Sequence, residues 1–170
     1  IAEFDRALGG GLVAGSATLI GGDPGIGKST LLLQAAALLA RAGRSVAYIS
    51  GEEAVEQIRA RAKRMGLADA PVNLAAATAL REILSTLKRE RFDIVIVDSV
   101  QTLWSDVHDS GPGSITQVRA CAGELVRRGV SAERLFVAGN SSRNPVAPND
   151  TAQGKAQNRR VEITLVPVRS

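Results

Sequence analysis

The stretch that decides the fold is residues 22–29, Gly22-Asp23-Pro24-Gly25-Ile26-Gly27-Lys28-Ser29, which fits the pattern G-x-x-x-x-G-K-[ST]. A β-rich run (17–22) leads into it, and a helical run rich in Leu and Ala (28–41) follows and is closed by Gly43. Glycines let a backbone wrap closely around phosphate groups, and the helix N-terminus adds the positive end of its dipole. This order of strand, glycine loop and helix predicts a phosphate-binding loop.

A buried strand downstream supplies a carboxylate to the same predicted site. The run DIVIVDS (93–99) is typical of a strand covered on both faces, and Asp98 ends it at the carboxyl edge of the sheet. We expect Asp98 and the Ser29 hydroxyl to hold Mg²⁺, and Lys28 to reach the β- and γ-phosphates as a point charge.

A third element follows the predicted strand 45–50. Glu52 lies where a carboxylate could position and deprotonate an attacking water, whereas Glu53 is expected to begin the next helix. Glu52 and Lys28 are therefore the candidate catalytic residues. The candidate contacts with ATP or ADP are Gly22, Asp23, Pro24, Gly25, Ile26, Gly27, Lys28, Ser29 and Thr30.

Short β-rich runs alternate with longer helical runs along the chain, which indicates an α/β fold. We expect a single domain over residues 1–170, with three layers (α/β/α) built on a mainly parallel sheet. Helices are expected at 28–41, 53–65, 79–89, 114–128 and 151–160, and strands at 17–22, 45–50, 73–77, 93–99, 134–140 and 161–168.

Composition limits the class of protein. Hydrophobic residues make up 45% of the chain and charged residues 22%, a balance typical of a globular protein. The net charge of +4 suits an anionic ligand or nucleic acid, but the basic run from Arg59 to Arg64 is expected to be a solvated helix face.

Cys121 is the single cysteine, which excludes a disulfide framework and a multi-cysteine zinc site. No apolar run approaches the roughly 20 residues that span a bilayer, so no membrane partner and a cytoplasmic location (recombinant expression) are expected. The chain begins with Ile1 rather than Met, so we expect a fragment or an engineered sequence.

The runs LGGGLVAGSATLIGGDPGIGKSTLLLQ (8–34), YISGEEAVEQIRARAKRMGL (48–67) and DIVIVDSVQTLWS (93–105) resemble the RadA/Sms family of bacterial RecA-like DNA-repair ATPases. The resemblance covers about residues 1–128. It implies a RecA-like P-loop fold with ATP and Mg²⁺, with Glu52 as the water-activating glutamate and Asp98 as the Walker B aspartate. It also implies that the strand 134–140 inserts between the phosphate-loop strand and the strand ending at Asp98. Asn140 would then face the nucleotide.

Residues of about 129–167 do not continue that resemblance and are similar to a different family. The run TAQGKAQNRRVEI (151–163) is similar to the carboxyl half of OmpA/MotB-type peptidoglycan-binding domains. The two resemblances together favour a deliberately built or recombined chimera, in which the OmpA-like segment supplies the last strands of the sheet, with 161–168 at its edge.

The preferred hypothesis is a chimeric domain that binds ATP·Mg with weak or no hydrolysis. Segments typical of either parent are missing, so neither nucleic acid nor peptidoglycan is an expected partner, and a monomer is favoured. Three alternatives stay open: a DNA-dependent ATPase in recombination or repair, a peptidoglycan-binding OmpA-like module, and a folded scaffold without a ligand.

Overall fold

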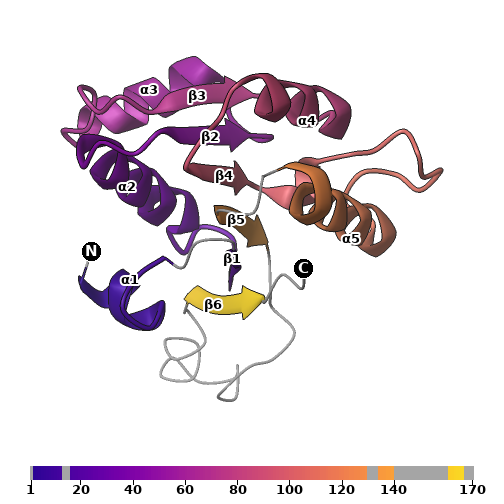
Figure 1. Cartoon of the computed structure of the whole chain (residues 1–170), viewed down its shortest axis with the longest axis horizontal. Coiled ribbons are helices and arrows are strands. Elements are labelled where there is room, and N and C mark those ends of the chain that lie inside the picture. The colour runs from indigo at the N-terminus through magenta and orange to yellow at the C-terminus, as the bar shows by residue number, and fades with distance from the viewer. Residues whose placement is uncertain (1, 13–15, 130–133, 140–160, 167–170) are drawn as a thin grey trace.

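The computed structural model describes residues 2–12, 16–129, 134–139 and 161–166. The strands of these residues form one sheet, in the order β3-β2-β4-β5-β1-β6 (Figure 1). The strands are β1 (Ser16–Gly22), β2 (Val46–Ser50), β3 (Asn73–Ala76), β4 (Ile94–Asp98), β5 (Arg134–Gly139) and β6 (Val161–Val166). All neighbours pair in parallel except β6, which runs antiparallel to β1. The α/β class and the mainly parallel sheet are therefore confirmed.

The two late strands lie where the sequence predicts them. β5 lies between β4 and β1, and β6 forms the edge beside β1. β6 runs antiparallel to β1. As a result, β1 has a partner on each side, and the loop that follows it starts from a strand in the interior of the sheet.

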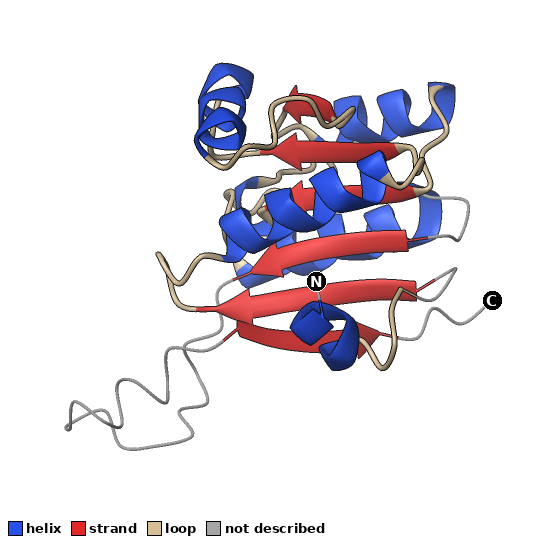
Figure 2. Cartoon of the chain, turned by 90° about the vertical axis from the view of Figure 1, so that its left-hand side faces the viewer, coloured by secondary structure: helices blue, strands red, loops and turns tan. Residues whose placement is uncertain are grey.

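Helices cover both faces of the sheet and complete three layers (Figures 1 and 2). They are α1 (Ala2–Ala7), α2 (Lys28–Arg41), α3 (Val55–Arg64), α4 (Leu80–Arg89) and α5 (Ile115–Glu124), with a 3₁₀ turn η1 (Val100–Thr102) and a π-helical turn η2 (Leu125–Gly129). One core joins α1, α2 and α3 to residues such as Ile20 and Ile96 of the sheet. A second core joins α4, η1 and α5 to the opposite face, including Ile49 and Val97.

Several local predictions need correction. α3 begins at Val55 rather than at residue 53, so Glu53 precedes the helix. The helix expected over 114–128 does start after its cap Ser114, whose hydroxyl accepts a hydrogen bond from the Gln117 amide, but it is α-helical only to Glu124. Trp104 is 40% exposed and therefore does not belong to the core. The expected helix at 151–160 and the expected sensor Asn140 lie outside the described residues.

Candidate nucleotide-binding site

The loop between β1 and α2 has a backbone that only glycine adopts readily. Gly25 has φ 77° and Gly27 has φ 102°, both in the left-handed region. A Cβ atom at either position would meet nothing within 4 Å, so the requirement is for backbone conformation and not for space. Gly27 is also the N-cap of α2, and neither a side-chain cap nor an acidic residue in the first turn neutralises the start of that helix. The loop therefore presents an uncapped positive helix end, as an anion site requires.

A cavity of about 310 Å³ lies against this loop. It is lined by Pro24, Gly25, Gly27, Lys28, Ser29, Thr30, Glu52, Arg61, Asp98, Ser99 and Gln101. Three separately predicted elements, the glycine loop, the residue after β2 and the end of β4, thus meet at one edge of the sheet. Of the predicted contacts, Gly22, Asp23 and Ile26 belong to the loop but do not line the cavity.

Lys28 lies folded over the start of the loop. Its Nζ donates hydrogen bonds to the carbonyl oxygens of Gly22, at 2.7 Å, and Asp23, at 2.9 Å. The ammonium group is therefore held at the mouth of the phosphate loop by backbone acceptors, which a bound phosphate could replace.

Asp98 is buried at the end of β4, and the peptide bond that follows it is cis. The Tyr48 hydroxyl of β2 donates a hydrogen bond of 2.5 Å to its Oδ2 atom. Burial of the ring, followed by the charge of Asp98, raises the pKa of Tyr48 well above its usual value, so the hydroxyl stays protonated. One oxygen of the Asp98 side chain is thus already held by the tyrosine hydroxyl.

Glu52 is positioned from two sides. Its backbone amide, and that of Glu53, donate to the Ser50 hydroxyl at 3.2 and 3.0 Å, which fixes the turn after β2. The Ser99 hydroxyl donates to Glu52 Oε1 at 2.7 Å. Two neighbouring strand ends therefore hold this carboxylate at the cavity.

Arg61 is the clearest residue that sequence reasoning placed wrongly. It was expected on a solvated basic face, yet its side chain is only 16% exposed, lines the cavity and forms an ion pair of 2.8 Å with Glu53. The spacing of three residues puts Arg61 on the same helix face as Ile58, which is buried, but the sequence alone does not show that this face turns toward the sheet. The prediction holds for Arg59, Lys63 and Arg64, which are exposed.

These donors fit a nucleotide with a magnesium ion. A hydroxyl (Ser29) and a carboxylate (Asp98) line the same cavity, and Mg²⁺ prefers oxygen ligands. Among the described residues no group of three or more His, Cys, Asp or Glu could hold a metal ion by itself. Mg²⁺ typically uses one or two protein ligands together with phosphate oxygens and water, which matches such a sparse donor set.

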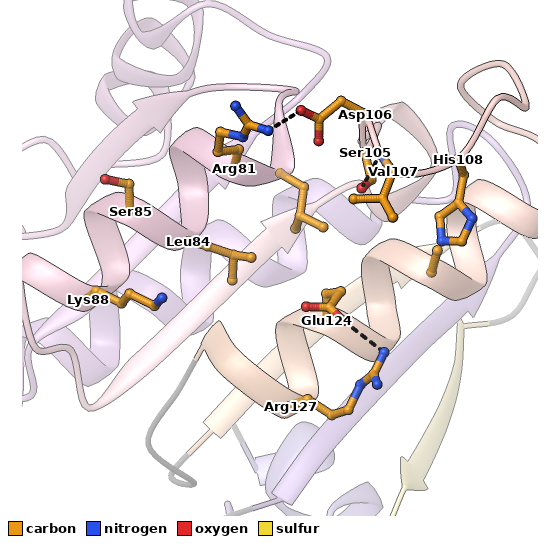
Figure 3. Close-up of a pocket in the computed structure, with 12 residues that line it drawn as sticks. Arg81, Leu84, Ser85, Lys88, Ser105, Asp106, Val107, His108, Glu124 and Arg127 are labelled. Carbon is orange, nitrogen blue, oxygen red and sulfur yellow. Dashed lines mark hydrogen bonds and ion pairs between the residues drawn. The ribbon is translucent and has the colours of Figure 1, made fainter.

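A second cavity, of about 480 Å³, lies on the other helical layer between α4, α5 and the loop 105–108 (Figure 3). Ion pairs join Arg81 to Asp106 and Arg127 to Glu124 at its rim. None of the predicted nucleotide contacts lines it. It is therefore separate from the phosphate loop.

Within the part of the chain that the structure describes, no helix has the length and apolar character to cross a membrane.

The mainly parallel sheet has a glycine loop after β1 and carboxylates after β2 and at the end of β4, and its fold matches RecA-like and KaiC-like P-loop domains. The family described as ATPase: KaiC matches residues 1–73. Over 132 residues the chain is 56% identical to the DNA repair protein RadA of Brucella abortus (strain 2308), covering 75% of this chain and 28% of that protein. Over 127 residues it is 48% identical to RadA of Bacillus subtilis (strain 168), with coverage of 75% and 28%. The chain thus spans about 28% of the length of these relatives, and over 75% of its own length it is similar to RadA.

Solved structures give the same fold. The crystal structure of the RadB recombinase superposes with a TM-score of 0.58 at 26% identity, covering 84% of this chain and 70% of that one. A KaiC-like protein from Pyrococcus horikoshii OT3 gives a TM-score of 0.63 at 17% identity, covering 81% and 68%, and shows the fold alone.

Two predictions gain nothing from these comparisons. The comparisons provide no support for an OmpA/MotB-like segment, so the chimera stays a prediction. The expectations of a monomer without nucleic acid also find no support, since the relatives are named DNA repair protein and recombinase.

Proposed function

We propose that the chain binds ATP, or ADP, together with Mg²⁺ in the cavity beside residues 22–29. The observation that carries this proposal is the meeting of Lys28, Ser29, Glu52 and Asp98 around one cavity at an uncapped helix N-terminus. These residues come from three segments that are far apart in sequence. Their convergence is what phosphate and magnesium recognition requires.

Each residue has a definite task in this proposal. The backbone amides of the loop residues that line the cavity, from Gly25 and Gly27 to Thr30, cradle the phosphates. Lys28 exchanges the Gly22 and Asp23 carbonyls for β- and γ-phosphate oxygens. Ser29 and Asp98 hold the Mg²⁺ shell. The ion, when bound, neutralises charge that develops on the phosphate oxygens.

Hydrolysis by an isolated copy is proposed to be weak or absent. Glu52 can accept a proton from water, but the arginine that lines the cavity, Arg61, is engaged by Glu53. In related NTPases, an arginine supplied to the transferred phosphoryl group contributes about 10³–10⁵ in rate. A chain whose cavity arginine is bound elsewhere lacks that contribution.

Thermal denaturation with and without MgATP tests the binding proposal. At a ligand concentration of about 100 times Kd, binding stabilises the folded state by about 2.7 kcal/mol, which corresponds to roughly 5–10 °C for a chain of this size. Lys28→Ala should abolish the shift, while the exposed Lys63→Ala on α3 should keep it. A parent protein that shows no shift with any nucleotide would refute the proposal.

A second candidate function is a DNA-dependent ATPase. It is favoured by the 56% identity to a protein named for DNA repair and by the net charge of +4. Phosphate release measured with and without single-stranded DNA separates it from the first candidate. Stimulation by DNA that falls steeply with salt supports this second function, and an unchanged rate rejects it.

We also propose that residues 1–128 and 129–170 form one domain, with an OmpA-like origin for the second segment. The single domain is supported by the pairing of β5 and β6 with β1 and β4, whereas the OmpA-like origin rests on the sequence resemblance alone. A single unfolding transition, seen both by circular dichroism and by Trp104 fluorescence, is expected. Two separated transitions would contradict it.

A further inference from the structure

A chain of polar contacts runs from the wall of the cavity through the core and back to Asp98. Arg61 of α3 donates to the Tyr48 hydroxyl at 3.4 Å and pairs with Glu53 at 2.8 Å. The Tyr48 hydroxyl in turn donates to Asp98 Oδ2 at 2.5 Å. The first and last residues of this series of contacts, Arg61 and Asp98, line the nucleotide cavity, whereas Tyr48 is 0% exposed.

The direction of each hydrogen bond in this series follows from which groups can donate and which can accept. A guanidinium group has donors only, so the Tyr48 oxygen must act as the acceptor toward Arg61. The single hydroxyl proton of Tyr48 is then left for Asp98, whose carboxylate can only accept. The arginine thereby orients the tyrosine proton toward the aspartate.

The fold makes this geometry rigid. Tyr48 pairs with Ile96 in the register of β2 and β4, which places its ring one step from Asp98 on the same face of the sheet. The buried residues Ile58 and Ala62 anchor α3 on that core, and Arg61 lies between them in sequence. The Arg61 Nε atom is buried without a hydrogen-bond partner, so the guanidinium is held against the site rather than in solvent.

We propose that Tyr48 and Arg61 are positioning residues for the magnesium side of the site. Tyr48 fixes one oxygen of Asp98, so that the other oxygen is presented to the Mg²⁺ shell, and Arg61 keeps the tyrosine hydroxyl in that orientation. This inference rests on the proposed binding of nucleotide with Mg²⁺. The inference adds Tyr48 and Arg61 to the proposed site as residues that contact neither the phosphates nor Mg²⁺. Their hydrogen bonds link α3 to the end of β4.

The test is the Mg²⁺ dependence of nucleotide affinity in Tyr48→Phe, which keeps the buried ring and removes only the hydroxyl. Fluorescent ATP analogue is titrated into the parent and the variant, in EDTA and in a series of Mg²⁺ concentrations. Affinity in EDTA should be unchanged, because the loop contacts remain. The Mg²⁺ concentration needed for half of the affinity gain should rise about tenfold, the usual scale for losing a hydrogen bond to a charged group.

Arg61→Gln and Lys63→Gln form a matched pair on α3, since each removes one positive charge and Lys63 is exposed. Arg61→Gln should shift the Mg²⁺ requirement in the same direction, and Lys63→Gln should not. If Arg61 acts through Tyr48, the double variant should be no worse than Tyr48→Phe alone. This pair also carries the test if circular dichroism shows that Tyr48→Phe does not fold.

The outcomes separate the two proposals. Equal Mg²⁺ dependence in the parent and both site variants overturns the positioning role while nucleotide binding stands. Equal losses in EDTA and in Mg²⁺ also overturn it, because the defect then lies in the phosphate loop. A parent that binds no nucleotide under either condition refutes the proposed function, and this inference with it.

Discussion

Replacing Gly51 by alanine tests how tightly the end of β2 is packed beside the site. A Cβ atom on Gly51 would lie 1.9 Å from Thr102 Oγ1 and 2.9 Å from Thr102 Cβ, which is closer than atoms can approach. The threonine cannot rotate freely, since its hydroxyl donates to the Ser99 carbonyl at 2.8 Å. Overpacking of this kind costs about 1–3 kcal/mol, and the lost hydrogen bond adds about 1 kcal/mol.

Gly51→Ala should therefore lower the free energy of unfolding by about 2–4 kcal/mol and the melting temperature by roughly 5–15 °C. Urea denaturation measures the first quantity and differential scanning calorimetry the second. Gly111→Ala is the control, because a Cβ atom there meets nothing within 4 Å.

Second-site variants identify the clash. Gly51→Ala combined with Thr102→Ala removes the oxygen at 1.9 Å and should recover part of the loss, while Thr102→Ser keeps that oxygen and should recover little. A Gly51→Ala variant as stable as the parent, or equal rescue by Ala and Ser, would refute the reasoning.

Three further predictions concern other parts of the molecule. Gln117 is 2% exposed. Its side-chain amide forms hydrogen bonds with the backbone of Ser105 and with the carbonyl oxygens of His108 and Ser110. Gln117→Ala should thus cost about 3 kcal/mol in urea denaturation and expose this loop to proteolysis; a loop as resistant as in the parent would contradict this. Under conditions in which the parent releases phosphate, Glu52→Gln should keep nucleotide affinity but lower that single-turnover rate by about 10² or more, and an unchanged rate would exclude Glu52 as the base. Burial raises the pKa of the Cys121 thiol, so above about pH 8.5 the unfolded chain loses its proton first and stability falls with rising pH, a slope that Cys121→Ala should lack.

The parts of the site that sequence predicts are those whose signal is local. The glycine loop and the helix Lys28–Arg41 follow from spacing alone, because phosphate cradles need particular residues at consecutive positions. Asp98 is predictable since it ends a short apolar run that a buried strand requires.

Tyr48 and Arg61 show what local signals miss. A tyrosine inside an apolar strand looks like an ordinary core residue, and only the β2–β4 register brings its hydroxyl to Asp98. Arg61 belongs to a basic run whose other members are exposed, so its place depends on how α3 is rotated against the sheet. Both facts are tertiary, and one sequence does not contain the pairing that decides them.

The pairing of β1 has a consequence for how the chain is made. The ribosome synthesises β1 before its partners β5 and β6, which begin more than a hundred residues later. At about 5–20 residues per second, this strand waits roughly 6–24 s with both edges unpaired. During that interval it can pair with other nascent chains, and a holdase that shields apolar segments would protect it. The phosphate loop, although made before β5 and β6, therefore becomes functional only after these strands have paired with β1, and nucleotide can assist only the stage of folding that follows their synthesis.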